Sequence, residues 1–226
     1  MQEYIDAKRN ILLYQNPPCR AVLGYENEIS RSMQKDCKGK QVWFTRLHDT
    51  DNGAFLRKED NMLCMAEDGV VTPFLAQKDV KLRGLHNIEN LLAAAAAVWG
   101  EVPVEAIRQV GSTFTGVEHR IEPVRTLDGV LYYNDSIGTS PTRTIAGLRS
   151  FDQKIILIAG GYDKHIPFDV LGPEVVEHVK LLILCGATAE KIEAAVKSAP
   201  NYLNGQPEIL HAQTLEEAVR LAKQYT

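Results

Sequence analysis

Two short polar segments in the second half of the sequence each follow a run of residues typical of a β-strand. Asn134-Asp135-Ser136 follows the strand predicted for 130–133, and Gly160-Gly161-Tyr162-Asp163-Lys164 follows the strand predicted for 154–159. Ligands bind beyond the carboxyl ends of strands in an open parallel sheet, so we expect both segments to face one crevice. Asp135 and Lys164 would then form a pair of opposite charges in a site. Taken alone, the first segment is more often an ordinary turn.

A predicted helix start lies close to these segments. Ser140 is a favoured helix cap, and Pro141 suits the first helical turn. The free N–H groups of such a turn can bind an anion, and Thr139 would sit at the mouth of that site. The alternative is that Ser140-Pro141 is only a cap. The convergence of this helix start with the two polar loops favours a site.

Two further places could bind a nucleotide or a phosphate. Asn87 and Asn90 are spaced i, i+3 at the start of an alanine-rich helix, so both amides can point the same way and offer donors and acceptors. Helix capping by Asn87 is about equally plausible. His119-Arg120 lies near a predicted domain boundary, where the arginine fork could clamp a phosphate. A surface arginine is the commoner explanation.

Lys8 has the sharpest competing interpretations. Tyr4, Lys8, Ile11 and Leu12 have helical spacing, which places a lysine within an apolar stripe. A partly buried lysine shifts towards its neutral amine, which can react with carbon dioxide to give a carbamate. Magnesium favours such oxygen ligands. The alternative is a lysine that extends from the stripe to solvent.

Predicted strands and helices in the first half must position these side chains. A helix is predicted over 1–15, ended by Asn16-Pro17-Pro18, and a strong helix over 88–99, ended by Gly100, with a short helix from Pro103. Short apolar runs predict strands at 21–24, 41–45, 62–66 and 70–74, the last two joined by an Asp68-Gly69 turn. We expect this strand-rich stretch to be paired locally.

The second half has a different rhythm. A hairpin is predicted over 121–134 through an Asp128-Gly129 turn, followed by strands at 154–159, 181–185 and 208–210 that alternate with helices, the last over 215–224. Such alternation predicts an α/β fold with a parallel sheet and helices on its faces. We place a domain boundary and a hinge near Gly116-Val117. The chain ends on a helix, so we expect its second domain to be incomplete.

Composition excludes several classes of protein. The 226 residues carry 25 basic and 29 acidic side chains, a net charge of −4, which provides no positive field for nucleic acid. No apolar run reaches the roughly 20 residues of a membrane span, and residues 1–10 do not resemble a signal peptide, so we expect a cytoplasmic protein. Cys19, Cys37, Cys64 and Cys185 lack the spacing of a zinc site or a disulfide framework.

Several catalytic motifs are absent from the sequence. It contains no phosphate-binding loop of the GxxxxGKS or GxxxxGKT type, no GxGxxG after a strand, no GxSxG and no HExxH. A self-sufficient ATPase, a typical NAD enzyme, a serine hydrolase and a zinc protease are each disfavoured.

Five segments taken together resemble the Mur ligases, the ATP-dependent amide-bond-forming enzymes of peptidoglycan synthesis. They are Tyr4-Ile5-Asp6-Ala7-Lys8, Leu85-His86-Asn87-Ile88-Glu89-Asn90, His119-Arg120-Ile121-Glu122, Asn134-Asp135-Ser136 and Gly160-Gly161-Tyr162-Asp163-Lys164. Each segment is weak alone, but all five occur in the order and spacing of the family. The last two resemble the members of the family that add D-glutamate.

The resemblance implies a catalytic role for three residues. Lys8 matches a lysine whose carbamate helps to bind Mg²⁺ in the full-length enzymes. Arg120, with His119 beside it, matches an arginine that reaches the phosphates of ATP. One departure is Ile137, which stands where many relatives have a lysine after Asn-Asp-Ser. An apolar side chain cannot supply the contact of that lysine.

The resemblance also implies binding roles. Asn87, Asn90 and Asp135, like Arg120, match positions near the nucleotide. Thr139 and Lys164 match positions that hold the carboxylates of the incoming D-glutamate.

The fold implied by the resemblance has two parts. Residues 1–117 would be the C-terminal part of the central α/β ATP-binding domain. Residues 118–226 would be the amino-acid-binding domain, a Rossmann-like, mostly parallel sheet with helices on both faces. The implied reaction is activation of UDP-N-acetylmuramoyl-L-alanine by ATP to an acyl phosphate, followed by attack of the D-glutamate amine. ATP and Mg²⁺ are the implied cofactors, and we expect a monomer.

The 226 residues contain no match for several parts that the family needs for turnover. The UDP-sugar domain, the phosphate loop and the segment that closes the D-glutamate pocket have no match, so we expect an inactive fragment with an unmodified Lys8. One alternative is another Mur ligase or a folylpolyglutamate synthase. A second is a non-catalytic nucleotide-binding module.

Overall fold

A computed structural model describes residues 2–226, which divide into two compact units. The first unit ends at Thr115, and the second runs from Gly116 to Thr226. Each unit combines β-strands with helices around its own hydrophobic core, so the predicted α/β fold class is confirmed. No helix among the described residues has both the length and the apolar character needed to cross a membrane.

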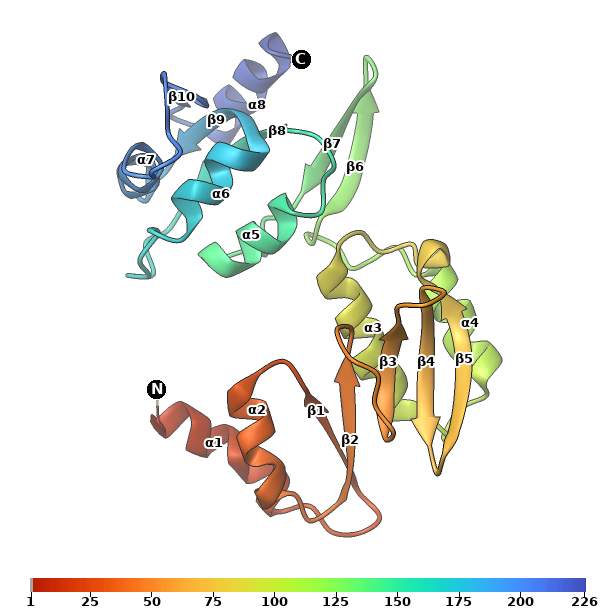
Figure 1. The fold of residues 1–226 in the computed structure, drawn as a ribbon. Helices are drawn as coiled ribbons and strands as arrows, with labels where there is room; N and C mark the ends of the chain where they lie inside the picture. Colours follow the sequence, from red (N-terminus) through yellow and green to blue (C-terminus); the bar gives the residue numbers. More distant parts are fainter. Residues whose placement is uncertain (1) are drawn as a thin grey trace. The chain divides into compact units, whose positions relative to one another are not determined.

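The first unit is built on one five-stranded sheet with its strands in chain order (Figure 1). The strands are β1 (Arg20–Gly24), β2 (Lys40–Thr45), β3 (Gly53–Arg57), β4 (Met62–Glu67) and β5 (Val70–Ala76). β1, β2 and β3 pair in parallel, whereas β3, β4 and β5 form an antiparallel meander. The expected local pairing is confirmed, because each strand pairs with its neighbour in the chain. The segment between the parallel strands β1 and β2 forms a crossover.

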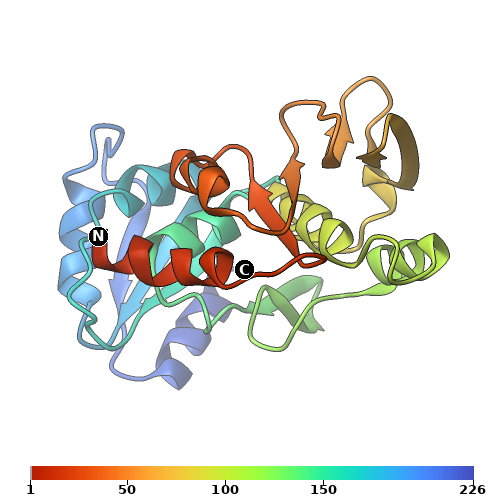
Figure 2. The same cartoon turned by 90° about the horizontal axis from the view of Figure 1, so that it is seen from below.

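Helices cover the sheet of the first unit (Figures 1 and 2). They are α1 (Gln2–Leu13), α2 (Glu28–Ser32), α3 (Leu85–Val98) and α4 (Val104–Thr113), with 3₁₀ turns at Met33–Asp36 and Gln77–Asp79. Leu92 of α3 packs with Leu63 and Phe74 of the sheet, and all three side chains are almost completely buried. Burial of each such side chain stabilises the unit by about 1.5–3 kcal/mol. The prediction lacked α2 and β3.

The second unit contains a hairpin and a separate parallel sheet. β6 (Glu122–Leu127) and β7 (Val130–Asn134) form the hairpin, and the sheet has the order β10 (Glu208–His211), β9 (Val179–Cys185), β8 (Ile155–Gly160). Both neighbours of β9 run parallel to it. The helices are α5 (Pro141–Leu148), α6 (Leu171–His178), α7 (Ala189–Lys197) and α8 (Leu215–Gln224).

Alternating side chains of β9 create a core on each face of this sheet. Leu182 and Leu184 pack with residues of α6 and α7, whereas Leu181 and Ile183 pack with residues of α8. Successive side chains of a strand point to opposite faces, so an uninterrupted apolar strand requires helices on both. The predicted mostly parallel sheet with helices on both faces is confirmed.

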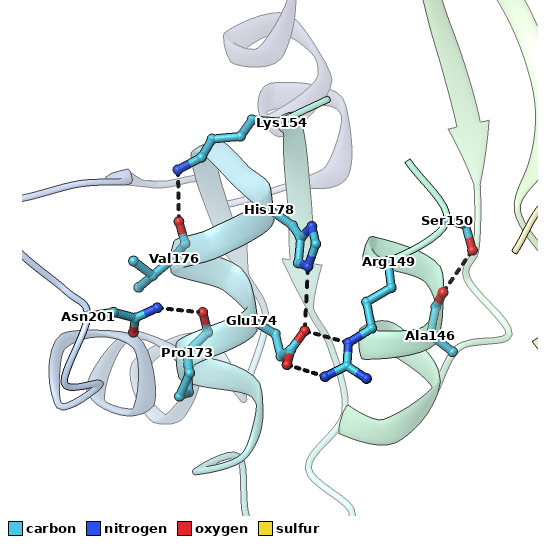
Figure 3. Close-up of polar contacts among 9 residues, drawn as sticks. All are labelled: Ala146, Arg149, Ser150, Lys154, Pro173, Glu174, Val176, His178 and Asn201. Atoms are coloured by element: carbon cyan, nitrogen blue, oxygen red, sulfur yellow. Dashed lines mark hydrogen bonds and ion pairs between the residues drawn. The ribbon is translucent and has the colours of Figure 1, made fainter. Parts of the chain in front are cut away.

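Polar contacts tie the end of α5 to α6 (Figure 3). Two guanidinium nitrogens of Arg149, Nε and Nη2, donate to the two carboxylate oxygens of Glu174, with a distance of 2.8 Å between Nε and Oε2. His178 Nε2 lies 3.6 Å from the same carboxylate. The hydrogen bonds from Arg149 lower the pKa of Glu174 below its ordinary value, and His178 adds a smaller effect. The pair therefore stabilises the second unit while Glu174 is ionised.

We expect Arg149→Met to reduce the free energy of unfolding by about 0.5–1 kcal/mol at about pH 7, since Arg149 is largely exposed. The pKa of Glu174 is lower in the folded state, so its contribution is present above the unfolded pKa and is lost as pH falls through the folded pKa. Urea unfolding at about pH 7 and about pH 2 should therefore show a difference between wild type and variant at the higher pH only. Arg143→Met removes an exposed arginine of α5 as the control. An equal loss at both pH values would contradict the ion-pair explanation.

Candidate functional site

The segment that follows β7 lies against the segment that precedes β6. Asp135 Oδ1 accepts the backbone N–H of Ile121 at 3.1 Å, and Asn134 Nδ2 lies 2.8 Å from His119 Nδ1. His119 carries an exposed ring, and Arg120 is half-buried. The structure thus brings together two of the segments that sequence reasoning selected separately, and it places Arg120 between residues that hold each other in position.

Asp135 and Lys164 do not form the charged pair expected from the sequence. β7 pairs with β6 in the hairpin, whereas β8 belongs to the three-stranded sheet, so the two polar loops do not share the carboxyl edge of one sheet. Among the described residues, no ion pair joins these two side chains, and the Asp135 carboxylate instead binds the Ile121 backbone. Asp128 has a φ of 52° and Gly129 a φ of 81°. These two residues form a tight hairpin turn, which brings β7 alongside β6.

The helix start predicted at Ser140-Pro141 lies where the sequence indicated. Ser140 is the N-cap residue of α5, and Pro141 occupies its first turn. The Ser140 hydroxyl contacts Thr142 Oγ1 at 3.2 Å and makes no capping hydrogen bond to the helix backbone. Thr139 is exposed just before the cap. The N–H groups of this first turn are therefore not capped by Ser140, and Thr139 stands beside them.

The loop after β8 presents Lys164 to solvent. Asp163, the residue before it, pairs with the Lys191 ammonium of α7 and accepts the backbone N–H of His165 at 2.8 Å. The hydrogen bond from Lys191 is the main cause that lowers the pKa of Asp163. A surface hollow of about 600 Å³ lies beside the loop and is lined in part by His165, Phe168 and Lys191. Lys191 was not identified from the sequence, because its contact with Asp163 spans 28 residues of chain.

Asn87 and Asn90 lie on one face of α3, as their spacing predicted. Asn90 Nδ2 donates to Asn87 Oδ1 at 3.1 Å, and Asn87 Nδ2 donates to the carbonyl of Arg83 at 2.7 Å. The N-cap residue is Gly84, so the alternative of helix capping by Asn87 is wrong. Asn90 is exposed on the first helical turns.

Lys8 is exposed rather than partly buried. α1 buries Leu12 and half-buries Ile5 next to β1, whereas Tyr4 and Ile11 are 64% and 66% exposed. The predicted apolar stripe is wrong because the buried face of α1 passes through Ile5 and Leu12. Lys8 Nζ lies 5.4 Å from the centroid of the Tyr4 ring, which is a cation–π distance.

The described residues alone do not fit a magnesium ion. Within residues 2–226, no group of three or more His, Cys, Asp or Glu side chains is arranged to hold a metal. An unmodified lysine ammonium donates hydrogen bonds and has no lone pair for a cation. Lys8 could contribute oxygen ligands only after conversion to a carbamate.

Two protein-family models match the chain, one in each unit. The model described as the Mur ligase middle domain matches residues 1–98, and the model described as the Mur ligase, glutamate ligase domain matches residues 119–226. The chain belongs to the Mur ligase family, as the five sequence segments indicated.

Curated relatives share almost half of their aligned residues with the chain. A UDP-N-acetylmuramoylalanine--D-glutamate ligase of Acetivibrio thermocellus is 47% identical over 227 residues, which cover 100% of this chain and 48% of the relative. A protein of the same name from Clostridium beijerinckii is 47% identical over 223 residues, covering 99% of this chain and 47% of the relative. The chain thus spans about half the length of the curated relatives that it matches.

Solved structures show the same fold at low sequence identity. MurF from Acinetobacter baumannii has a TM-score of 0.71 and 16% identity over 100% of this chain and 50% of that one. A Mycobacterium tuberculosis folylpolyglutamate synthase complexed with ADP and AMPPCP has a TM-score of 0.68 and 15% identity over 99% of this chain and 52% of that one. These likenesses establish the fold only.

Proposed function

We propose that the chain supplies the middle and glutamate-ligase domains of an ATP-dependent ligase that joins D-glutamate to UDP-N-acetylmuramoyl-L-alanine. The observation that carries this proposal is the 47% identity, over the whole chain, to a relative named for that activity. Peptidoglycan synthesis in the cytoplasm would be its setting. The chain spans half of such relatives, so the activity belongs to a longer polypeptide.

The proposed reaction has two steps. A carboxylate oxygen of the UDP-sugar substrate attacks the γ-phosphorus of ATP, and the bond to ADP breaks to leave an acyl phosphate. The D-glutamate nitrogen then attacks the acyl carbon, loses a proton, and expels phosphate. Arg120, with its planar fork of donors, is suited to the phosphate oxygens in both steps, and His119 stands beside it.

The remaining residues are assigned to binding. Asn87 and Asn90 share one face of α3 and would contact the nucleotide. Asp135 is also assigned to the nucleotide, and one of its oxygens binds the backbone of Ile121. Thr139 and Lys164, both exposed, would hold the carboxylates of D-glutamate.

ATP and Mg²⁺ are the proposed cofactors of the complete enzyme. Bound magnesium supplies charge stabilisation to a transferring phosphoryl group. Lys8 is proposed as the residue of this chain that holds it, through a carbamate, once further ligands are present. Among the residues of this chain, Arg120 would orient the phosphate, and Thr139 and Lys164 would orient the amino acid.

A chimera tests the proposal. We expect a protein in which this chain replaces its aligned segment in the Acetivibrio thermocellus relative to release phosphate with ATP, magnesium, UDP-N-acetylmuramoyl-L-alanine and D-glutamate. The 226-residue chain alone is expected to give no turnover, because the sequence contains no phosphate-binding loop. Phosphate release is followed by a coupled assay, and the product is identified by mass spectrometry.

The choice of amino acid separates the alternatives. A chimera that prefers a diamino acid to D-glutamate would favour another Mur ligase, and one that joins glutamate to a folate in place of the UDP-sugar would favour a folylpolyglutamate synthase. A well-folded chimera without turnover on any of these substrates would support a non-catalytic nucleotide-binding module.

A further inference from the structure

The backbone on each side of Arg120 is left-handed. His119 has a φ of 65° and Ile121 a φ of 46°. Positive φ is uncommon for any residue other than glycine, and for a β-branched residue such as isoleucine it is an outlier. Such conformations persist only where surrounding contacts determine them, and they cluster at functional sites. Contacts around Arg120 must therefore hold this backbone in place.

Backbone groups next to Arg120 are held by acidic side chains. Glu122 Oε2 accepts the N–H of His119 at 2.8 Å, and Asp135 Oδ1 accepts the N–H of Ile121 at 3.1 Å. The carbonyl of His119 accepts the N–H of Ile137 at 3.2 Å. Hydrogen bonds to ionised acceptors are stronger than those between neutral groups, so these contacts can hold a strained segment.

Asn134 fixes the ring of His119. Its Oδ1 accepts the N–H of Ser136 at 3.1 Å, which orients the amide so that Nδ2 points at His119 Nδ1, 2.8 Å away. The same Nδ2 lies 3.5 Å from Glu122 Oε2. A donor directed at Nδ1 leaves the proton of the neutral ring on Nε2.

The hairpin explains why these two side chains converge. Glu122 and Asn134 are opposite one another in the register of β6 and β7, at the open end of the ladder. Side chains at opposite positions of an antiparallel pair lie on the same face and are close neighbours. Both therefore reach the segment that enters β6, which is the segment that carries Arg120.

We propose that Glu122 and Asn134 are positioning residues that hold His119 in its left-handed conformation and so fix the point from which the next residue, Arg120, extends. This inference rests on the proposed function, in which Arg120 contacts the phosphates of ATP. Both act through His119: Glu122 holds its backbone N–H, and Asn134 holds its ring.

Amide hydrogen exchange in the 226-residue chain tests the proposal directly. Glu122→Ala and Asn134→Ala are expected to speed exchange at the His119 and Ile121 amides about tenfold, because a held segment becomes locally mobile. Amides of the β6–β7 ladder and the unfolding midpoint should stay close to wild type. Glu122→Gln keeps an acceptor oxygen and should retain most of the protection. Glu118→Gln removes an exposed carboxylate of the same segment as the control.

The proposal is overturned if His119 exchange is unchanged in Glu122→Ala. It is equally overturned if the whole hairpin exchanges faster together with His119, since that result would indicate only a structural role for the hairpin. Neither outcome depends on enzymatic activity.

Kinetics of the chimera supply a second readout. Glu122→Ala is expected to raise KM for ATP and lower kcat about tenfold each, with KM for D-glutamate unchanged, and Glu122→Gln should restore most of the activity. A rise confined to KM for D-glutamate would contradict the proposal that Glu122 positions Arg120 at the phosphates of ATP. If the unsubstituted chimera is inactive, the proposed function fails, and the exchange experiment alone decides whether Glu122 and Asn134 hold the segment.

Discussion

Gly160→Ala is expected to destabilise the second unit by more than about 4 kcal/mol, a large fraction of the stability of a typical domain. Gly160 ends β8 with a φ of 132°, and a Cβ added there would lie 1.7 Å from the carbonyl oxygen of Cys185. Cys185 is the partner of Gly160 on β9, so the clash is between backbone and side chain in the ladder itself. The clash could be relieved only if β8 and β9 moved apart. Urea unfolding followed by far-ultraviolet circular dichroism measures the loss.

Gly161 provides a matched control for this prediction. Its φ of 128° is nearly the same as that of Gly160, but a Cβ at Gly161 would meet no atom within 4 Å. Gly161→Ala therefore introduces the backbone strain without the clash and should cost about 1–3 kcal/mol. Equal losses in the two variants would mean that β8 and β9 move apart easily, which would contradict the explanation given for Gly160.

Local signals in the sequence were sufficient for most of the fold. Asp68-Gly69 and Asp128-Gly129 both occur in turns with two positive φ values, as hairpins with such turns require. The alanine-rich α3 and the apolar β9 follow from periodicity and from the length of their apolar runs. These features depend on residues close together in the chain, and sequence patterns describe such residues well.

The missing and incorrect elements depend on distant contacts. β3 begins at Gly53 after a polar stretch that is typical of a loop, and it is a strand because β2 and β4 pair with it on either side. The buried face of α1 is decided by β1 and Met33, which lie well beyond the helix. Periodicity within α1 cannot reveal which of two possible stripes its neighbours cover.

In the candidate site, too, the sequence predicted local features and missed those that depend on distant contacts. The residues around Arg120 were selected from the sequence, but the hydrogen bond from Ile121 to Asp135 depends on a left-handed backbone that no residue type at 119–121 suggests. The expected pairing of Asp135 with Lys164 assumed one continuous sheet, and the local turn at Asp128-Gly129 placed β7 in a hairpin instead. Residue types thus selected the candidate side chains, and backbone geometry determined which groups meet.

Arg120→Ala in the chimera is expected to lower kcat/KM for ATP by about 10²–10³, the loss typical when one donor to a developing anion is removed. Arg120→Lys should recover only part of the activity, because an ammonium keeps the charge and lacks the planar fork for two phosphate oxygens. Arg125→Ala, at an exposed arginine of β6, is the matched control and should leave kcat/KM close to wild type. Initial rates of phosphate release at varied ATP give the parameters, and circular dichroism verifies the fold. A loss seen only when D-glutamate is varied would instead place Arg120 at the amino acid, and Glu122 and Asn134 would then position an amino-acid contact.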